Sequence, residues 1–274
     1  MISVVIALLN RRETLARCLD SVAAQTYPQR EVIVIDGGST DGGVELLRQR
    51  AGELAHWESE PDRGLYHAFN KGLRRARGEW LYFLGADDHL WEPQALERMA
   101  PHLARALPAH RVVYAQANFV SPAGEVLETM GRPWEVSRAR FLQGFMIPHQ
   151  ATFHHRSLFA ARGEFDESFR MGGDYEMLLR ELPERAPLFV PGVIVAAYRF
   201  GGASSAPANT FEVLRVVRRA QRRNGVRPGL LWYAAVARAL IRVALWTLLG
   251  ERAAKRMLDW GRALLGKPAF WTRI

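Results

Sequence analysis

Residues 78–92 of this 274-residue chain, GEWLYFLGADDHLWE, decide its fold. The middle of the stretch, WLYFL at 80–84, is a short apolar run that predicts a strand buried on both faces. Two adjacent carboxylates, Asp87 and Asp88, follow a turn-like Gly-Ala pair. The carboxyl ends of parallel strands form the ligand crevice of an open α/β sheet, where two oxygen donors suit Mg²⁺ or Mn²⁺. The alternative is an Asp-Asp turn that caps a helix beginning near Trp91.

The chain upstream of this stretch predicts a βαβ unit. Apolar runs at 2–9 and 31–36 predict two strands, with a helix between them whose N-cap is Asn10. A glycine-rich loop follows the second strand at 37–42, and a further helix is predicted at 44–52. Continuous apolar runs of this kind are typical of a buried parallel sheet. The predicted fold class is therefore α/β.

The rest of the chain predicts further helices and strands. The helix predicted at 65–77 carries a stripe of small residues, Ala68, Gly72 and Ala76, which would let it lie close to a strand. Helices are also predicted at 93–107, 134–145, 157–161 and 174–182, and strands at 112–115, 118–120, 126–127, 151–155 and 187–200. We expect an α/β domain over 1–206 and a helical tail over 207–274.

The composition favours a globular protein of a reducing compartment. A hydrophobic content of 49% can build a sizeable core. The single cysteine, Cys18, excludes an internal disulfide and a cysteine-based zinc site. The N-terminal run MISVVIALLN has no basic region and ends too early for a signal peptide or a membrane span. A cytoplasmic location is therefore expected.

The net charge of +9 is concentrated in the tail. Residues 211–274 hold 14 Lys and Arg against three Asp and Glu. The tail contains no recognisable nucleic-acid-binding module, and the preceding domain is close to neutral, so no nucleic-acid partner is expected. An anionic surface near the tail fits this charge distribution better.

The tail segment 229–250 is apolar and nearly long enough to span a membrane. Arg238 and Arg242, four residues apart, share one helical face, and each costs about 2.5–3.5 kcal/mol at mid-span. A helix that lies in the membrane interface fits better, with four tryptophans as anchors: Trp232, Trp246, Trp260 and Trp271. The alternative is a helical cap packed on the domain, with both arginines at the solvent edge.

Four elements now stand in order along the chain. They are the strand ending at Asn10, the strand ending at Asp36, the segment EPDRGLYHAFNKG at 60–72, and GADD at 85–88. In these motifs the chain resembles family 2 glycosyltransferases of the GT-A fold, particularly bacterial transferases of exopolysaccharide and lipopolysaccharide assembly. The resemblance implies a Rossmann-like, mostly parallel sheet flanked by helices, and sugar transfer from a nucleoside diphosphate sugar.

The resemblance implies that the loops after the first two strands bind the nucleotide. Asp36 matches the acid that binds the base of the donor, and Asn10 and Gly38 lie in matching loops. The alternative for Asp36 is an Asx-type turn acid placed before two glycines.

A second set of donor contacts is implied further along the chain. Asp62 and Arg63 match the segment that contacts nucleotide and diphosphate, where an arginine fork suits phosphate. Lys71 keeps a possible nucleotide role, and Arg199 precedes a loop at 201–205 that resembles the family's closing loop. The alternatives are a surface ion pair at Asp62 and Arg63, a solvated helix face at Lys71, and an ordinary linker after Arg199.

The two carboxylates of the opening stretch match the metal and ribose positions of the family's DxD motif. Asp88 and Asp87 are the expected metal ligands, and Asp87 is also an expected donor contact. The chain departs from the common Asp-Ser-Asp-Asp form because Gly85 stands where the first acid would be. This departure leaves open which acid holds the metal and which contacts the ribose.

The second half must supply a base and an acceptor site. The motif MGGDYE at 171–176 resembles the family's late acidic motif, in which the Asp is the general base. In a single inverting displacement the acceptor hydroxyl loses its proton as it attacks, and Asp174 is the expected base. Glu176 is the fallback base and an expected acceptor contact, together with His149. The alternatives are a helix cap at Asp174 and a structural histidine at 149.

The predicted function is inverting, metal-dependent sugar transfer to a hydroxyl of a glycan or lipid-linked glycan, at the cytoplasmic face of a membrane. One alternative is a degenerate binding module, suggested by Gly85. Another, a dinucleotide-dependent oxidoreductase, is weakened because the first strand-to-helix turn, LLNRR at 8–12, lacks G-x-G-x-x-G.

Overall fold

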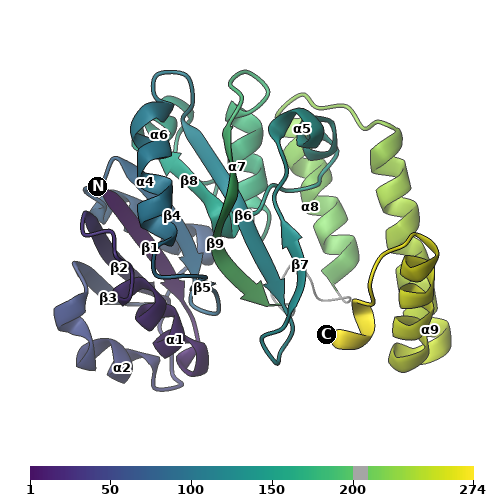
Figure 1. Ribbon diagram of the computed structural model, residues 1–274, viewed down its shortest axis with the longest axis horizontal. Helices are drawn as coiled ribbons and strands as arrows, with labels where there is room; N and C mark the ends of the chain where they lie inside the picture. The colour runs from purple at the N-terminus through teal and green to yellow at the C-terminus, as the bar shows by residue number, and fades with distance from the viewer. Residues whose placement is uncertain (200–208) are drawn as a thin grey trace.

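The computed structural model describes residues 1–199 and 209–274 of the chain. Within these residues nine strands form one sheet, in the order β3-β2-β1-β4-β8-β6-β9-β5, with β7 paired to β6. Figure 1 shows the sheet between layers of helices, with the C-terminal helices α8 and α9 at one side. The strands are β1 (Ile2–Leu8), β2 (Arg30–Asp36), β3 (His56–Ser59), β4 (Trp80–Gly85), β5 (His89–Leu90), β6 (Val112–Val120), β7 (Val126–Met130), β8 (Thr152–His155) and β9 (Leu188–Arg199).

The first half of the sheet is parallel, as the sequence predicts. Strand β1 pairs in parallel with β2 and β4, and β2 pairs in parallel with β3. Alternate residues enter different cores: Val4 and Ile6 pack in one hydrophobic cluster, and Val5 packs in the other. The prediction that the 80–84 run is buried on both faces is confirmed, since all five residues are buried.

The second half of the sheet is mixed, so the sheet is less parallel than expected. Strand β8 pairs antiparallel with β4 and β6, while β6 pairs in parallel with β9. The two strands expected at 112–115 and 118–120 are one continuous strand, β6. The short strand β5 was not expected. This strand pairs antiparallel with β9. The pairing places Asp87 and Asp88, which directly precede β5, beside the C-terminal end of β9.

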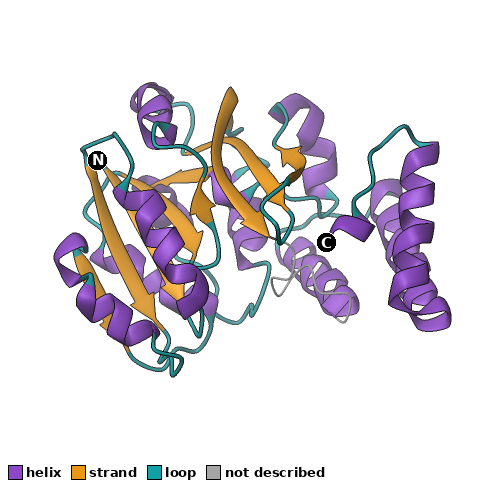
Figure 2. Ribbon diagram, turned by 60° about the horizontal axis from the view of Figure 1, so that its bottom comes forward, coloured by secondary structure: helices purple, strands orange, loops and turns teal. Residues whose placement is uncertain are grey.

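Helices cover both faces of the sheet, as Figure 2 shows. Buried residues of α1, α2 and α4 join one core, and those of α3, α6, α7 and α8 join the other. The helices are α1 (Arg12–Ala23), α2 (Gly43–Gln49), α3 (Leu65–Arg75), α4 (Ala95–Ala106), α5 (Trp134–Leu142), α6 (Arg156–Arg162), α7 (Gly173–Glu181), α8 (Thr210–Arg223) and α9 (Leu230–Leu264), with short 3₁₀ helices at Ala51–Glu53, His149–Ala151 and Trp271–Arg273.

The small-residue stripe of α3 lets this helix lie directly on β1. A Cβ atom on Gly72 would sit only 2.3 Å from the Val5 side chain, and Ala68 and Ala76 are also buried. No larger residue fits at 72 without displacing the helix from the sheet. This close packing holds the start of α3 over the carboxyl ends of β1 and β2.

One capping expectation and one capping alternative are wrong. Helix α1 has Arg11 at its N-cap, and Asn10 adopts a left-handed backbone with φ of 50°. The backbone N–H of Arg12 instead donates to Asp41 Oδ2 at 2.8 Å, so the β2–α2 loop caps α1. Helix α4 begins at Ala95 with Gln94 at its N-cap, which places Asp87 and Asp88 too far upstream to cap it.

The tail consists of two different parts. Helix α8 packs on the domain, since Val216 and Ala220 belong to the core that includes α7. Helix α9 is interrupted at Gly250, where φ is 74°, and most of its large apolar side chains are exposed. By length and composition α9 is the one helix among the described residues that could cross a membrane. Only 6% of its apolar 18-residue stretch is buried. The expected boundary at 206 and the loop at 201–205 lie outside the described residues.

Candidate active site

A cavity of about 400 Å³ lies at the carboxyl ends of β1 and β4. Four residues singled out from the sequence line it together: Asp87, Asp88, His149 and Asp174. They come from the β4–β5 turn, the 3₁₀ helix before β8 and the start of α7. The fold therefore brings the two predicted metal ligands and the predicted base into one space. Other lining residues include Arg11, Tyr66, Gln150, Arg170 and three valines of α8, Val213, Val216 and Val217.

The two carboxylates differ in environment. Asp88 is buried, and both burial and the neighbouring Asp87 raise its pKa well above the usual range. A hydrogen bond from the Gln150 side chain opposes this rise. The Asp87 side chain is 42% exposed, and its Oδ2 lies 3.7 Å from Arg11 Nε. Two acids at one turn, one of them desolvated, form a site whose charge a divalent cation would balance.

Gly85 leaves room for this arrangement of the two carboxylates. A Cβ atom there would lie 2.8 Å from Asp87 Oδ1 and 3.2 Å from Asp88 Oδ2. The space that the acid of the common motif would enter is therefore occupied here by the carboxylates of Asp87 and Asp88. Among residues 1–199 and 209–274 no group of three His, Cys, Asp or Glu side chains could hold a metal ion by itself. The two acids fit a cation that takes its other ligands from a bound diphosphate or from water.

Arginines surround the carboxylates, and sequence reasoning singled out only one of them. Arg17 Nη2 is buried without a hydrogen-bond partner in the described chain. Burial and the positive charge of Arg199 lower the pKa of Arg17, while the negative charges of Asp88 and Asp87 oppose this. The expected donor contact Arg199 ends β9, and its Nε is also buried without a partner there. Cationic groups with free N–H donors beside two acids suit a metal-bound diphosphate.

The predicted base lies at the beginning of α7. The N-cap of this helix is Gly172, so Asp174 is not its cap. The Tyr66 hydroxyl donates to Asp174 Oδ1 at 2.9 Å, and His149 Nδ1 lies 3.7 Å from Oδ2. A Cβ atom on Gly173 would lie 2.7 Å from the Tyr66 ring, so the second glycine of the motif permits this contact. Tyr66 was missed from sequence, although it lies in the predicted 60–72 segment.

His149 is held in an aromatic environment. Its ring lies 6.0 Å from the Phe69 ring and 6.2 Å from the His154 ring, measured between centroids. Burial lowers the pKa of His149, and Asp174 opposes this. Burial also lowers the pKa of His154 to about 3, so two neutral imidazoles are expected. His154 is fully buried in β8 and does not line the cavity, whereas His149 does.

The loops after β1 and β2 are joined to each other. Asp36 is fully buried, and its carboxylate accepts hydrogen bonds from Ser59 Oγ at 2.6 Å and from the backbone N–H groups of Ser39 and Gly38 at 3.0 and 3.2 Å. These contacts form the Asx-type turn of the alternative interpretation. The Asn10 side chain accepts from the Thr40 backbone N–H at 2.9 Å. Base binding by Asp36 remains a prediction.

The predicted donor-binding segment at 60–72 contacts the loop that follows β2. A Cβ atom on Gly37 would lie 3.3 Å from the Asp62 side chain, so the two loops are in contact. Lys71 Nζ lies 2.9 Å from Asp62 and 2.7 Å from Glu60, and although burial opposes it, these contacts raise the pKa of Lys71. Lys71 is thus a largely buried ion-pair partner. The exposed Arg63 pairs with Glu167 at 2.5 Å, which is the surface ion pair of the alternative.

Glu176 lies away from the cavity. Its carboxylate is buried, lies 2.8 Å from Arg180 Nη2 and accepts from the Asn224 side chain at 3.3 Å. Two residues after Asp174 on a helix, it points to a different side, towards the end of α8. The structure does not bring the fallback base and acceptor contact to the site.

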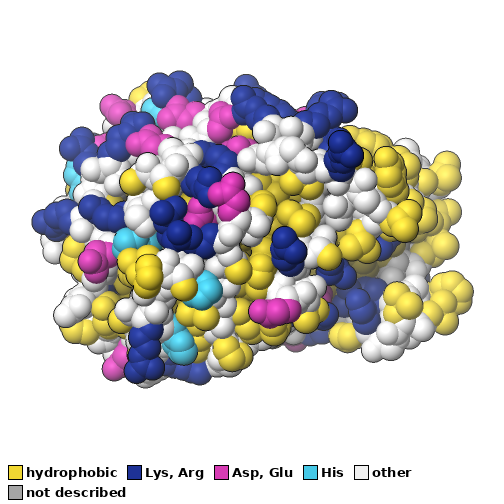
Figure 3. All heavy atoms as spheres, turned by 90° about the horizontal axis from the view of Figure 1, so that it is seen from above, with side chains coloured by type: hydrophobic (Ala, Val, Ile, Leu, Met, Phe, Trp, Pro, Cys, Tyr) yellow, Lys and Arg dark blue, Asp and Glu magenta, His cyan; other side chains and the backbone are white. Residues whose placement is uncertain are grey.

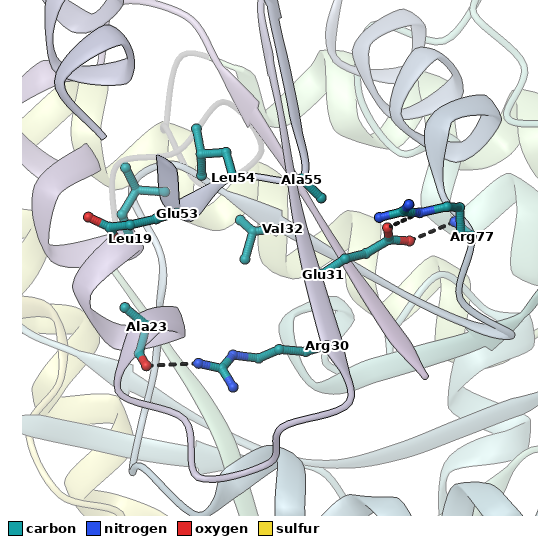
Figure 4. Close-up of a pocket in the computed structure, with 9 residues that line it drawn as sticks. All are labelled: Leu19, Ala23, Arg30, Glu31, Val32, Glu53, Leu54, Ala55 and Arg77. Atoms are coloured by element: carbon teal, nitrogen blue, oxygen red, sulfur yellow. Dashed lines mark hydrogen bonds and ion pairs between the residues drawn. The ribbon is translucent and has the colours of Figure 1, made fainter. Parts of the chain in front are cut away.

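A second cavity, of about 470 Å³, lies at the opposite ends of the strands. Figure 4 shows that Arg30 donates to the Ala23 carbonyl and that Arg77 donates to Glu31. Glu53, which also lines this cavity, accepts from Arg50 Nε at 2.9 Å. Glu31 also accepts from Ser3 Oγ at 2.6 Å. These residues join the N-terminal ends of the strands to the neighbouring helix and loops, so the charged residues of this cavity have a structural role.

The Glu31 network predicts a pH-dependent stability. Burial opposes the charge, but hydrogen bonds from Ser3 and Arg77 outweigh it and lower the pKa of Glu31. A lowered carboxyl pKa contributes stability above the pKa of the unfolded chain, and this contribution is lost as the pH falls. We expect Glu31→Gln to lower the free energy of unfolding by about 1.5–3 kcal/mol at neutral pH and by less in acid. Urea unfolding at both pH values tests this, with the exposed Glu45→Gln as control; an equal cost at both would contradict it.

Comparisons with known proteins agree with this geometry. A PGL/p-HBAD biosynthesis glycosyltransferase of Mycobacterium bovis is 32% identical over 214 residues, which cover 75% of this chain and 79% of the relative. An uncharacterized glycosyltransferase of Mycobacterium tuberculosis is 33% identical over 218 residues, covering 78% and 81%. Residues 3–169 match the family model described as glycosyl transferase family 2.

Solved structures of glycosyltransferases share the fold. Staphylococcus aureus TarS in complex with UDP-GlcNAc matches with a TM-score of 0.63 at 17% identity, over 90% of this chain and 73% of TarS. The mannosyltransferase PcManGT of Pyrobaculum calidifontis, in complex with GDP-Man and Mn²⁺, matches with a TM-score of 0.60 at 21% identity, over 96% and 79%. The fold is of the GT-A type. The chain belongs to glycosyl transferase family 2.

Proposed function

We propose that the protein transfers one sugar, with inversion, from a nucleoside diphosphate sugar to a hydroxyl of a glycan or lipid-linked glycan. The observation that carries this proposal is that Asp87, Asp88 and Asp174 line one cavity. The relative from Mycobacterium bovis is named for PGL/p-HBAD biosynthesis, which supports a role in cell-surface polysaccharide or glycolipid assembly. The ligands named for TarS and PcManGT support a nucleotide sugar as donor and Mg²⁺ or Mn²⁺ as cofactor.

The residues divide the work of a single displacement. Asp174 takes the proton of the acceptor hydroxyl as the oxygen attacks the anomeric carbon. Tyr66 donates to Asp174 and fixes its orientation for the attack. Asp88 and Asp87 would hold the cation, which would offset charge on the diphosphate leaving group. Arg17, Arg199 and the exposed Arg11 add positive charge around the diphosphate. Asp36, Gly38, Asn10 and Asp62 shape the loops expected to hold the nucleoside.

The tail is proposed to hold this domain at the cytoplasmic face of a membrane. Figure 3 shows hydrophobic side chains gathered over the region of α9, with basic side chains beside them. Exposed apolar residues occur on both arms of the helix, among them Leu230, Leu248, Trp260 and Leu265. A basic helix with an exposed apolar face suits an anionic membrane surface. We retain the division into a catalytic domain, 1–206, and a tail, 207–274, with no nucleic-acid partner.

A thermal-shift panel tests the donor. We expect one of UDP, GDP, dTDP or CMP, or a sugar that it carries, to stabilise the protein in the presence of Mn²⁺ and much less in its absence. A ligand at a hundred times its Kd stabilises by about 2.7 kcal/mol, which is readily measured. Stabilisation by none of them, with or without metal, would count against the proposed donor chemistry. NAD serves as the negative control, because tight NAD binding would favour an oxidoreductase.

A further inference from the structure

A groove of about 650 Å³ lies between α8 and the two arms of α9. It is lined by Thr210, Val213 and Leu214 of α8, by Phe145, by Trp271, and by residues of both arms of α9, such as Ala239 before Gly250 and Leu258 after it. Most of these side chains are apolar. The groove therefore offers a long apolar surface that no described part of the chain fills.

This groove adjoins the active-site cavity. Val213 of α8 lines both spaces. Phe145 lines the groove, while its neighbours in the chain, Gly144 and Met146, line the cavity. Figure 1 shows α8 between α7, which carries Asp174, and α9. A molecule that lies in the groove can thus extend past α8 towards Asp174.

The charged residues of the groove are all arginines. Arg238, Arg242 and Arg262 line it, and no Asp or Glu does. Arg262 donates to the Pro268 carbonyl at 2.9 Å. Arg242 donates to Thr210 Oγ1 at 2.8 Å, but its Nε is buried without a hydrogen-bond partner in the part of the chain that the structure describes. A cation buried without a counter-ion is costly, so this position suits a bound anion.

Aromatic rings hold these guanidinium groups beside the groove. Arg242 lies 5.7 Å from the Trp271 ring centroid, and Arg238 lies 5.8 Å from that of Phe145. Arg238 and Arg242 form no ion pair among residues 1–199 and 209–274. A planar guanidinium fixed in this way can present two parallel N–H donors to a phosphate.

We propose that the groove binds the acceptor's lipid, an amphiphile with an aliphatic chain along α9 and a phosphate or diphosphate at Arg242 and Arg238. This proposal rests on the proposed function, because the glycan attached to the phosphate would pass Val213 and present its hydroxyl to Asp174. The exposed apolar rim, which includes Ile241 and Leu265, lets the rest of the chain remain in a bilayer. The acceptor class is then a lipid phosphate, and a free glycan is a poorer substrate.

Calorimetric titration of the full-length protein with decyl phosphate, below its micelle concentration, tests the groove. Decyl maltoside provides the same chain with a neutral head, and inorganic phosphate provides the head alone. We expect decyl phosphate to bind at least about tenfold more tightly than decyl maltoside, and inorganic phosphate not to saturate. Equal affinity for the two amphiphiles would overturn the proposal.

Variants locate the two halves of the ligand. Arg242→Gln should remove the preference for decyl phosphate and leave decyl maltoside unchanged, whereas the exposed Arg256→Gln should change neither. Ala239→Phe, which fills the groove, should weaken both amphiphiles at least about tenfold, whereas Ala234→Phe, outside the groove, should not. If Arg256→Gln weakens binding as much as Arg242→Gln, the proposal is wrong. It is also wrong if Ala239→Phe binds both amphiphiles normally while the protein binds phosphatidylglycerol vesicles. Either result would mean that the arms of α9 dock on a bilayer.

Nucleotide binding by the same variants separates this proposal from the proposed function. Ala239→Phe and Arg242→Gln should keep the Mn²⁺-dependent nucleotide shift of the wild type and its unfolding temperature. A protein that binds decyl phosphate through Arg242 but binds no nucleotide would retain the groove and contradict the donor chemistry. If the protein binds nucleotide but Arg242→Gln does not change the affinity for decyl phosphate, the donor chemistry is retained and the groove proposal is contradicted.

Discussion

Replacing Asp174 by Asn is expected to lower the rate of sugar transfer by about 10²–10⁴-fold, the usual contribution of a positioned general base. The amide keeps the volume of the side chain and can still accept from Tyr66, but it cannot take a proton. Nucleotide binding should stay within about twofold of the wild type, because Asp174 is on α7, whereas the two acids proposed to bind the donor lie in the β4–β5 turn. Transfer kinetics and the Mn²⁺-dependent thermal shift on the same preparation measure both quantities.

The control for Asp174 is Glu176→Gln. Glu176 is an acid two residues away in the same helix, but it is buried against Arg180 and Asn224, outside the cavity. Its replacement should lower stability rather than the rate per folded molecule. Asp174→Asn with a rate within about threefold of the wild type would exclude the base assignment. A wild type that binds nucleotide but neither transfers nor hydrolyses the donor would favour a binding module without turnover.

The order of the elements and the position of the site follow from local patterns. The apolar runs of β1, β2 and β4 are continuous, and the small residues of α3 let this helix pack closely on β1 and β2. Such patterns depend on neighbouring residues, so sequence suffices to place Asp87 and Asp88 at the carboxyl edge of the sheet. Asp174 was singled out differently, from the resemblance of MGGDYE at 171–176 to the family's late acidic motif.

Most of the details missed from sequence depend on contacts between distant segments. Asn10 has the residue type of an N-cap, but Asp41 takes that role because the β2–α2 loop reaches the first turn of α1. Arg17 was missed because it comes from α1. Arg199 was expected, and the pairing of β5 with β9 brings the end of β9 to the two acids. Glu176 fails for a local reason: two positions along a helix turn the side chain away from Asp174.

Replacing Asp88 by Asn is expected to abolish the Mn²⁺-dependent part of nucleotide stabilisation and to lower transfer by about 10²–10³-fold. Asp88 is the stronger candidate for the main ligand because it is desolvated, next to Asp87 and lacking a direct ion pair among the described side chains. A bare carboxylate in this setting gains more from a cation than the exposed Asp87, which Arg11 already neutralises in part. Asp87→Asn should therefore have a smaller effect on the metal response.

Gly85→Ala tests whether cation binding depends on the space around the two acids as well as on their charge. The added Cβ would lie 2.8 Å from Asp87 Oδ1 and must displace at least one carboxylate, although both acids remain. If the geometry of the two acids holds the cation, Gly85→Ala should weaken the Mn²⁺ response in the same direction as Asp88→Asn. A normal Mn²⁺ response in both variants would show that the cation is held elsewhere or is not used. A loss in Asp88→Asn alone would mean that one carboxylate suffices, and that the glycine is tolerated rather than required.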